Sequence, residues 1–126
     1  MSKTKEEYLS LYEELLGFVP PKINHRVSLG LEVAPETLDA VEAMREKVMY
    51  PDALDIKTAQ MILFACLLTN LAPAAKIHAI AAKRAGATRE ELHAVAGLAF
   101  LFRGLSAFNN GAQIINEVFS GDETIG

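Results

Sequence analysis

Several common patterns are missing from this chain. Its single cysteine, Cys66, excludes a framework of intramolecular disulfides. No cationic, apolar leader opens the sequence, and together with the lone cysteine this predicts a cytoplasmic protein. The most apolar run, residues 61–68, is broken by Thr69 and Asn70 and is far shorter than the roughly 20 residues of a membrane span. We therefore expect no membrane partner.

Basic residues are also scarce. The chain has 12 Lys+Arg against 16 Asp+Glu, a formal net charge of -4 at pH 7. Nucleic-acid-binding domains need a basic surface against the phosphate backbone, so nucleic acid is not an expected partner. The sequence also has no metal-binding cluster of Cys and His, no glycine-rich phosphate loop and no nucleophile elbow. It therefore predicts no metal and no cofactor.

What the chain does contain indicates a folded helical domain. Of its 126 residues, 51% are hydrophobic and 22% are charged, which is enough apolar material to bury a core. The length suits one domain. Glycines and prolines recur at about the length of a helix, and alternating runs of β-branched residues are absent. The sequence predicts an all-α fold.

The N-terminal part predicts three amphipathic helices. The first begins at a capping box formed by Thr4 and Glu7 and ends at Gly17. Pro20 and Pro21 suit the entry to the second helix and Pro35 the first turn of the third, because proline is favoured at the start of a helix. The face of the third helix expected to be buried carries Leu38, Val41, Met44, Arg45 and Val48.

The C-terminal part predicts four more helices. Residues 55–70 have almost no polar face, which indicates a central helix surrounded by others. Pro73 opens the next helix and Gly86 ends it, and Thr88 with Glu91 forms a second capping box before the sixth. The apolar stripes expected on the last two helices are Leu92, Val95, Ala99 and Phe102, then Phe108, Ala112, Ile115 and Phe119.

The sequence from residue 78 to 92, HAIAAKRAGATREEL, is followed by LAF at residues 98–100. This block resembles the carboxymuconolactone decarboxylase family, which also contains the AhpD-like alkyl hydroperoxidases. The resemblance implies an oligomeric, all-α AhpD-like bundle of about six to seven helices in a single domain over residues 1–126. Within it we expect N-terminal helices at 1–50, the core family region at 51–119 and a frayed tail at 120–126.

The family divides on one motif. Its peroxidase members carry Cys-x-x-Cys-x-x-x-His, and here the two thiol positions fall at Leu71 and Ala74 while His78 is retained. The upstream glutamate of those members falls, depending on register, at Ala59 or Gln60. Peroxide reduction needs a thiolate and a resolving partner. Cys66 is expected to be buried in the apolar helix and has no second cysteine. The resemblance therefore favours the decarboxylase branch.

His78 is the predicted acid–base residue. Its helical neighbours one and two turns away include four alanines: Ala74, Ala81, Ala82 and Ala85. The imidazole would stand in a shallow apolar trough, where desolvation favours the neutral ring and suits it to passing a proton. From the residues alone, the alternative is a core histidine bonded to a backbone carbonyl. The resemblance favours the catalytic role.

The decarboxylase branch implies an anionic small-molecule substrate, a carboxylated butenolide, and a role in aromatic compound catabolism. Loss of carbon dioxide needs no obligatory cofactor and leaves a dienolate that takes up a proton. Lys57 and Arg103 are expected as further catalytic residues that bind the anion, although both could be simple helix-end charges. The amides expected to contact substrate are Gln60, Asn70, Asn109 and Asn110. Asparagines near helix ends could instead be caps.

Three classes of function remain open: a cofactor-free lyase or related proton-transfer enzyme, a thiol peroxidase relative, and a catalytically silent binding or assembly protein. An enzyme should place His78 beside a cavity with a cationic or amide group, whereas a silent protein should pack it over. The apolar central helix and the alanine-rich segment 72–85 predict a homo-oligomer, and the resemblance implies a trimer or hexamer.

Overall fold

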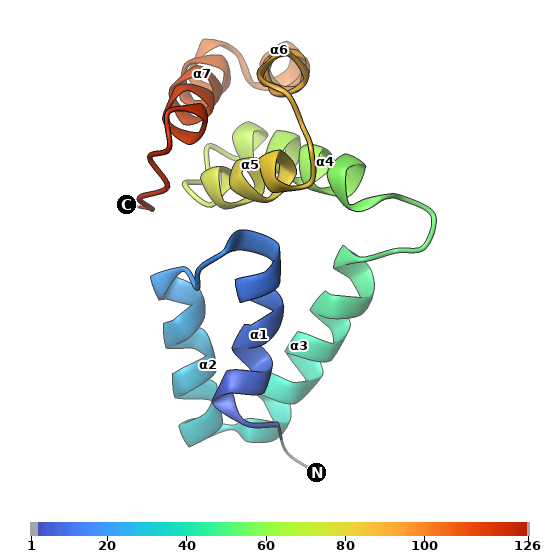
Figure 1. Cartoon of the computed structure of the whole chain (residues 1–126), viewed down its shortest axis with the longest axis vertical. Helices are drawn as coiled ribbons and strands as arrows, with labels where there is room; N and C mark the ends of the chain where they lie inside the picture. Colours follow the sequence, from blue (N-terminus) through green and yellow to red (C-terminus); the bar gives the residue numbers. More distant parts are fainter. Residues whose placement is uncertain (1–2, 126) are drawn as a thin grey trace. The chain divides into compact units, whose positions relative to one another are not determined.

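Helices make up the regular secondary structure of this protein. The computed structural model describes residues 3–125, and these contain seven α-helices and no strand (Figure 1). The predicted all-α class and the predicted number of helices are confirmed. The helices form two compact units, one ending at Ala53 and one beginning at Leu54. This division lies three residues beyond the boundary expected between residues 50 and 51.

The N-terminal unit holds α1 (Lys5–Leu16), α2 (Pro21–Val33) and α3 (Pro35–Met49). Thr4 and Glu7 form the predicted capping box, each side chain bonding the backbone N–H of the other. Gly17 ends α1 in the left-handed conformation, with φ at 83°. These helix ends follow from local chemistry, and the sequence predicted them correctly.

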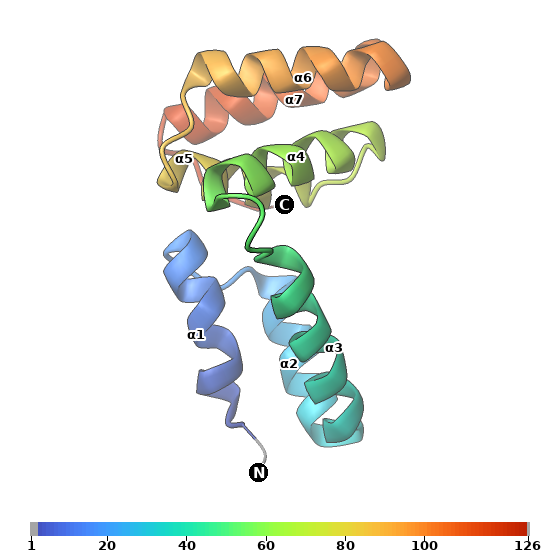
Figure 2. The same cartoon turned by 90° about the vertical axis from the view of Figure 1, so that its right-hand side faces the viewer.

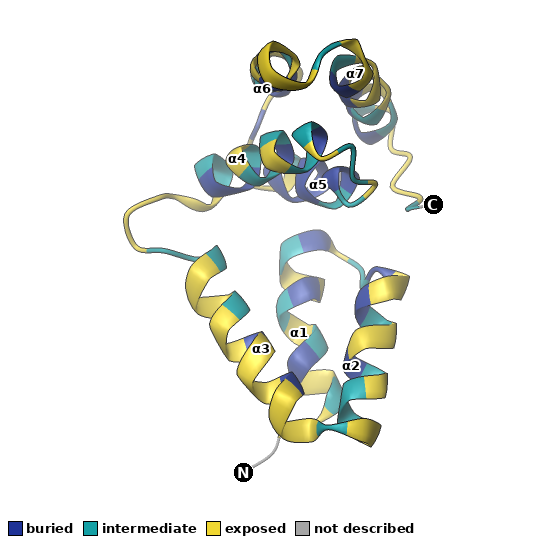
Figure 3. Ribbon diagram, turned by 180° about the vertical axis from the view of Figure 1, so that it is seen from behind, coloured by how far each residue is buried: buried dark blue, intermediate teal, exposed yellow. Residues whose placement is uncertain are grey.

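The buried face of α3 differs from the prediction. Leu38 is buried, but Val41, Met44 and Val48 are 47–71% exposed (Figure 3). The other buried residue of α3 is Glu42, one turn beyond Leu38. Glu42 is buried because its carboxylate accepts a hydrogen bond from the Tyr12 hydroxyl of α1. A polar contact to another helix therefore sets the orientation of α3, and apolar spacing alone could not reveal it.

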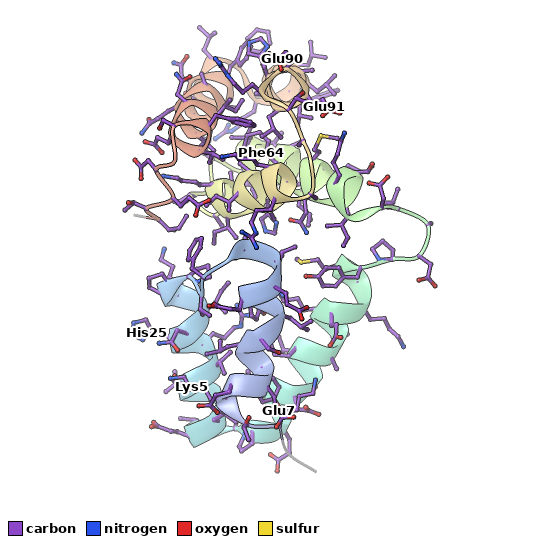
Figure 4. All side chains as sticks on the ribbon, in the orientation of Figure 1. Lys5, Glu7, His25, Phe64, Glu90 and Glu91 are labelled. Carbon is purple, nitrogen blue, oxygen red and sulfur yellow. The ribbon has the colours of Figure 1, made fainter. Side chains whose placement is uncertain are left out.

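The C-terminal unit holds α4 (Ile56–Thr69), α5 (Ala75–Arg84), α6 (Arg89–Arg103) and α7 (Leu105–Phe119). α4 packs against each of the other three helices, and α6 and α7 lie side by side along it (Figure 2). Phe64 of α4 is completely buried inside this unit (Figure 4). α4 is central to its unit, as expected, although Ile62 and Cys66 on its other side are exposed.

α6 and α7 approach each other closely at Gly111. A Cβ added there would lie 2.8 Å from Ala96 Cβ and 3.1 Å from Leu68 Cδ1. The buried residues of α7 are Ala107, Gly111, Ile115 and Val118. Of the predicted stripe only Ile115 belongs to this face, and in α6 the predicted Phe102 is 89% exposed. The predicted stripe of α7 omitted Ala107 and Gly111, whose small size permits the close packing of these helices.

The two ends of α5 are formed by unlike turns. Gly86 follows the helix with φ at 105°, as predicted, and Thr88 and Glu91 form the capping box of α6. Before α5, Leu71 has φ at 53° although it is not glycine. The Ala72 N–H bonds to a carbonyl five residues back, at 2.9 Å, which is the signature of a Schellman turn ending α4.

The chain after α7 was expected to fray, and its described part is held instead. Asp122 and Thr124 both contact the ammonium of Lys76 in α5. The sequence does not reveal this because the partners are about 50 residues apart. Gly126 lies outside the described residues.

Candidate functional site

Two predicted site residues meet inside the C-terminal unit. Gln60 lies one turn into α4 and is completely buried, and His78 in α5 is 8% exposed. α4 and α5 are joined by a short turn and pack together, which brings the two side chains into contact. His78 Nδ1 lies 2.7 Å from Gln60 Oε1. Of the two registers that the sequence left open, the structure puts Gln60, rather than Ala59, against the histidine.

This contact distinguishes the two ring nitrogens of His78. An amide oxygen only accepts hydrogen bonds, so Nδ1 donates to Gln60 Oε1. The neutral ring then carries its proton on Nδ1 and its lone pair on Nε2. The protonated ring keeps the same bond and adds a proton at Nε2. Nε2 is therefore the atom suited to act as base in one state and as acid in the other.

The nitrogen end of the Gln60 amide has no partner of its own. Within residues 3–125, Gln60 Nε2 is the buried side-chain atom that lacks a hydrogen bond. Burying an unpaired donor costs about 1–3 kcal/mol, and nearly all buried polar groups in proteins are paired. The structure therefore places an unsatisfied buried donor next to a buried imidazole.

On α5 itself the positions one turn from His78 carry alanine, whereas its contact on α4 is the polar Gln60. Ala81 and Ala82 of α5 are buried to 1% and 0% exposure, while Ala74 is half-buried and Ala85 is exposed. Two of the four predicted alanines are therefore buried together with His78.

Lys57 lies one turn before Gln60 on α4 but is engaged elsewhere. Its Nζ forms an ion pair with Glu91 Oε2 at 2.8 Å, and both side chains are about one-third exposed. Figure 4 shows Glu91 at the beginning of α6. The hydrogen bond from Lys57 is the largest cause that holds the pKa of Glu91 below its ordinary value. To bind a substrate anion, Lys57 would have to exchange this partner.

The remaining predicted residues are not gathered around His78. Arg103 is an exposed residue of the last turn of α6, where a cation complements the helix dipole. Asn70 caps α4 and donates from Nδ2 to the Cys66 carbonyl oxygen at 3.0 Å. Asn109 and Asn110 are exposed on α7. The structure thus gives Asn70 the helix-end role that the sequence had left as its alternative.

Cys66 does not have the environment expected of it. The sequence predicted burial, but Cys66 is exposed. It lies two residues from both Phe64 and Leu68, which are buried, so it occupies the opposite side of α4. The two thiol positions of the peroxidase motif, Leu71 and Ala74, lie at the turn before α5. Cys66 lies eight residues before Ala74 and therefore occupies neither thiol position of the motif.

A cavity of about 390 Å³ lies elsewhere in the same unit, between the turn after α4, α5, α7 and the C-terminal tail. His78 and Gln60 are not among its lining residues, whereas Lys76 is. Lys76 was not predicted from the sequence. Its position as the one lysine or arginine in the alanine-rich run from Pro73 to Ala82 was the signal that could have identified it.

Comparisons with known proteins agree with the resemblance noted in the sequence. The model of the carboxymuconolactone decarboxylase family matches residues 35–117, about two thirds of the chain. The match begins at α3, earlier than the expected core region at 51–119. No curated protein and no solved structure matches the chain.

Among residues 3–125, no helix is long and apolar enough to cross a membrane. No group of three or more His, Cys, Asp or Glu side chains in the same range could hold a metal ion.

Proposed function

Because this chain belongs to the carboxymuconolactone decarboxylase family, we propose that it is a proton-transfer enzyme acting on a small carboxylated lactone, with His78 as its acid–base group. Decarboxylation is the reaction we favour. The observation that carries the proposal is the buried hydrogen bond of 2.7 Å between His78 Nδ1 and Gln60 Oε1. This contact supports Nε2 as the nitrogen that takes up and releases a proton, because Nδ1 is held by the amide oxygen.

The proposed reaction balances with one proton taken from solvent per turnover. The bond between the ring carbon and the carboxylate breaks, carbon dioxide leaves, and the electron pair passes into the lactone as a dienolate. Protonated His78 then delivers the Nε2 proton to carbon and becomes neutral, and a proton from solvent restores its charge. No electrons are gained or lost overall, so the reaction requires no redox cofactor. A poorly solvated pocket favours the loss of charge from the carboxylate.

Gln60 supports a second part of this mechanism. Its Nε2 is a buried donor without a partner among residues 3–125, and a donor aimed at developing negative charge stabilises a transition state. We assign it to an oxygen of the lactone. Of the predicted cations, Lys57 is the better candidate for the substrate carboxylate, since it lies one turn from Gln60 on α4. Arg103 and the asparagines have weaker support.

The peroxidase alternative has less support. Leu71 and Ala74 replace both thiols of the motif that defines it. Cys66 is exposed, but it is the single cysteine of the chain and has no resolving partner within it. A silent binding or assembly protein is favoured by a specific observation, the low exposure of His78 at 8%. A structural histidine would have the same burial, so activity measurements must separate these two functions.

We also propose that the protein acts as a cytoplasmic homo-oligomer, a trimer or hexamer. Large apolar side chains are exposed around the end of α6 and the beginning of α7: Leu98, Leu101, Phe102 and Leu105. Exposed apolar patches of this kind commonly mark contacts between subunits. The single cysteine suits a reducing compartment. Light scattering that gives 13.7 kDa, the mass of one chain, at all concentrations would contradict the oligomer.

The test of the proposed function compares two histidine variants. Carboxylated lactones are screened with the wild type, and both carbon dioxide release and lactone consumption are measured. His78→Ala should lose about 10²- to 10⁴-fold in turnover, the usual contribution of a positioned acid or base. His25→Ala is the matched control, because His25 projects from α2 into solvent (Figure 4). Circular dichroism checks that both variants fold.

Equal turnover by folded His78→Ala and His25→Ala would remove His78 from the mechanism. If the wild type itself consumes none of the lactones while its His78 is buried as described, the silent binding protein becomes the better interpretation.

A further inference from the structure

A buried lysine lies on the other side of α5 from His78. Lys76 is 6% exposed and is the only buried lysine or arginine among residues 3–125. It precedes His78 by two residues, which is about 200° around a helix with about 100° per residue. The two side chains therefore leave α5 in nearly opposite directions. A buried ammonium is costly unless oxygen acceptors surround it.

Three oxygens contact the Lys76 ammonium. Glu117 Oε1 of α7 lies 2.9 Å from Nζ, and the Thr124 carbonyl oxygen accepts a hydrogen bond at 2.6 Å. Asp122 Oδ1 is more distant, at 3.7 Å, and its side chain is 49% exposed. Two of these contacts lie within hydrogen-bond distance, whereas Asp122 is held by charge attraction alone. Two of the three oxygens belong to the tail after α7, and the Asp122 contact is the weakest.

The same lysine lines the cavity of about 390 Å³. This volume lies within the range of about 300–1,000 Å³ that is typical of small-molecule sites. Leu68, Leu71 and Ile114 supply its apolar wall. Asp122 and Thr124 also line it. The tail therefore bounds the cavity at the point where it contacts the lysine.

Leu71 gives independent support for a ligand site here. It is the one non-glycine residue with positive φ in residues 3–125, at 53°, and glycine is the usual residue at that place in a Schellman turn. A glycine would remove the strain but would also remove a side chain from the wall of the cavity. Strained residues of this kind concentrate at ligand sites.

We infer that this cavity is a second ligand site, for a small carboxylate with an apolar body, and that the C-terminal tail competes with the ligand. The ligand carboxylate takes the place of Asp122 and the Thr124 carbonyl at Lys76, and the tail moves aside. The apolar body lies against Leu71 and the neighbouring apolar wall. This inference does not depend on the role of His78.

Charge favours a carboxylate over other ligands. Lys76, Glu117 and Asp122 together carry one net negative charge, and a monocarboxylate in place of Asp122 leaves that charge unchanged. An amine would bring a second cation beside the Lys76 ammonium. A dianion such as phosphate would add a negative charge close to Glu117. A ligand whose single carboxylate replaces that of Asp122 avoids both of these electrostatic costs.

The experiment titrates benzoate into the full-length protein by nuclear magnetic resonance and calorimetry. Amide signals of Leu71, Lys76 and Thr124 should shift, and those of Gln60 and His78 should not. Asp122→Ala should bind benzoate about 2- to 5-fold more tightly, because it removes an exposed competing ion pair. Glu123→Ala is the matched control, since it removes the same charge from the adjacent exposed position and should change affinity less.

Neutral benzyl alcohol and cationic benzylamine test the charge argument, and both should bind more weakly than benzoate. Lys76→Met should abolish benzoate binding. If that variant does not fold, the comparison of Asp122→Ala with Glu123→Ala decides. The inference is wrong if benzoate causes no shift at this cavity at millimolar concentration, if benzylamine binds better, or if Asp122→Ala binds no more tightly than Glu123→Ala.

Discussion

The two units of this protein differ in how fully their buried polar clusters are hydrogen-bonded. In the N-terminal unit, Tyr12 donates to Glu42 at 2.7 Å, and Arg26 donates to both of them. In the C-terminal unit, Gln60 pairs with His78 at one end of its amide only. A polar cluster that satisfies itself stabilises the fold, whereas a buried donor left unsatisfied costs stability. A role beyond folding should therefore be sought at the buried polar group that is left unsatisfied.

The cluster of Tyr12, Arg26 and Glu42 should be the more costly one to break. Glu42→Ala leaves a buried hydroxyl and a guanidinium without their acceptor, so we expect a loss of about 3 kcal/mol in the free energy of unfolding. Urea denaturation measures it. Glu46→Ala, an exposed position on the same helix, is the control and should change little. Similar losses in the two variants would mean that the cluster has no structural role.

The same cluster predicts a response to alkaline pH. Burial is the largest cause that raises the pKa of Tyr12 from 10.0 to about 12, and the Glu42 hydrogen bond adds to it. The folded state thus holds this proton more tightly than the unfolded chain. Its contribution, about 2 kcal/mol, is present below pH 10 and is lost as the pH rises toward 12. Tyr12→Phe, which has no phenol, should show a smaller decline over that interval. A parallel decline would refute the assignment.

Close packing in the C-terminal unit is tested by a pair of glycines. Gly111→Ala places a methyl group 2.8 Å from Ala96 Cβ, and we expect a net loss of about 1 kcal/mol despite the better helix propensity of alanine. Gly97→Ala meets nothing within 4 Å and should gain about 0.5–1 kcal/mol. Thermal unfolding of both variants gives the comparison. A loss in both, or in neither, would show that Gly111 is not a contact point.

Cys66→Ala should have the smallest effect. Cys66 is exposed on α4, away from the buried Phe64, and the chain lacks both thiols of the peroxidase motif. We expect no peroxide consumption by the wild type and unchanged lactone turnover by the variant. Peroxide consumption that disappears in Cys66→Ala would overturn the exclusion of redox chemistry.

The sequence predicted features that depend on local chemistry. The capping boxes at Thr4 and Thr88, and the left-handed glycines Gly17 and Gly86, marked helix ends correctly. Each of these signals involves residues within a few positions of one another, so no knowledge of the tertiary fold is required. The family was recognised for a related reason, since the block from His78 is continuous in the chain.

Features that depend on partners from distant helices were missed. The burial of Glu42 depends on Tyr12 and Arg26, and the burial of Lys76 depends on α7 and the tail. At the candidate site, His78 and Gln60 were both named from the sequence, but their contact depends on the register between α4 and α5. Hydrophobic spacing predicts which face of a helix can be buried, but it does not identify the residues of other helices that pack against that face.

The nitrogen spectrum of His78 tests the central claim most directly, because it needs no substrate. In ¹⁵N-labelled protein at a pH where the ring is neutral, we predict a proton on Nδ1 and a lone pair on Nε2, since Nδ1 donates to Gln60 Oε1. Gln60→Leu should abolish this preference. A neutral ring with its proton on Nε2 in the wild type, or a spectrum that Gln60→Leu leaves unchanged, would contradict the proposed role of the bond between Gln60 and His78.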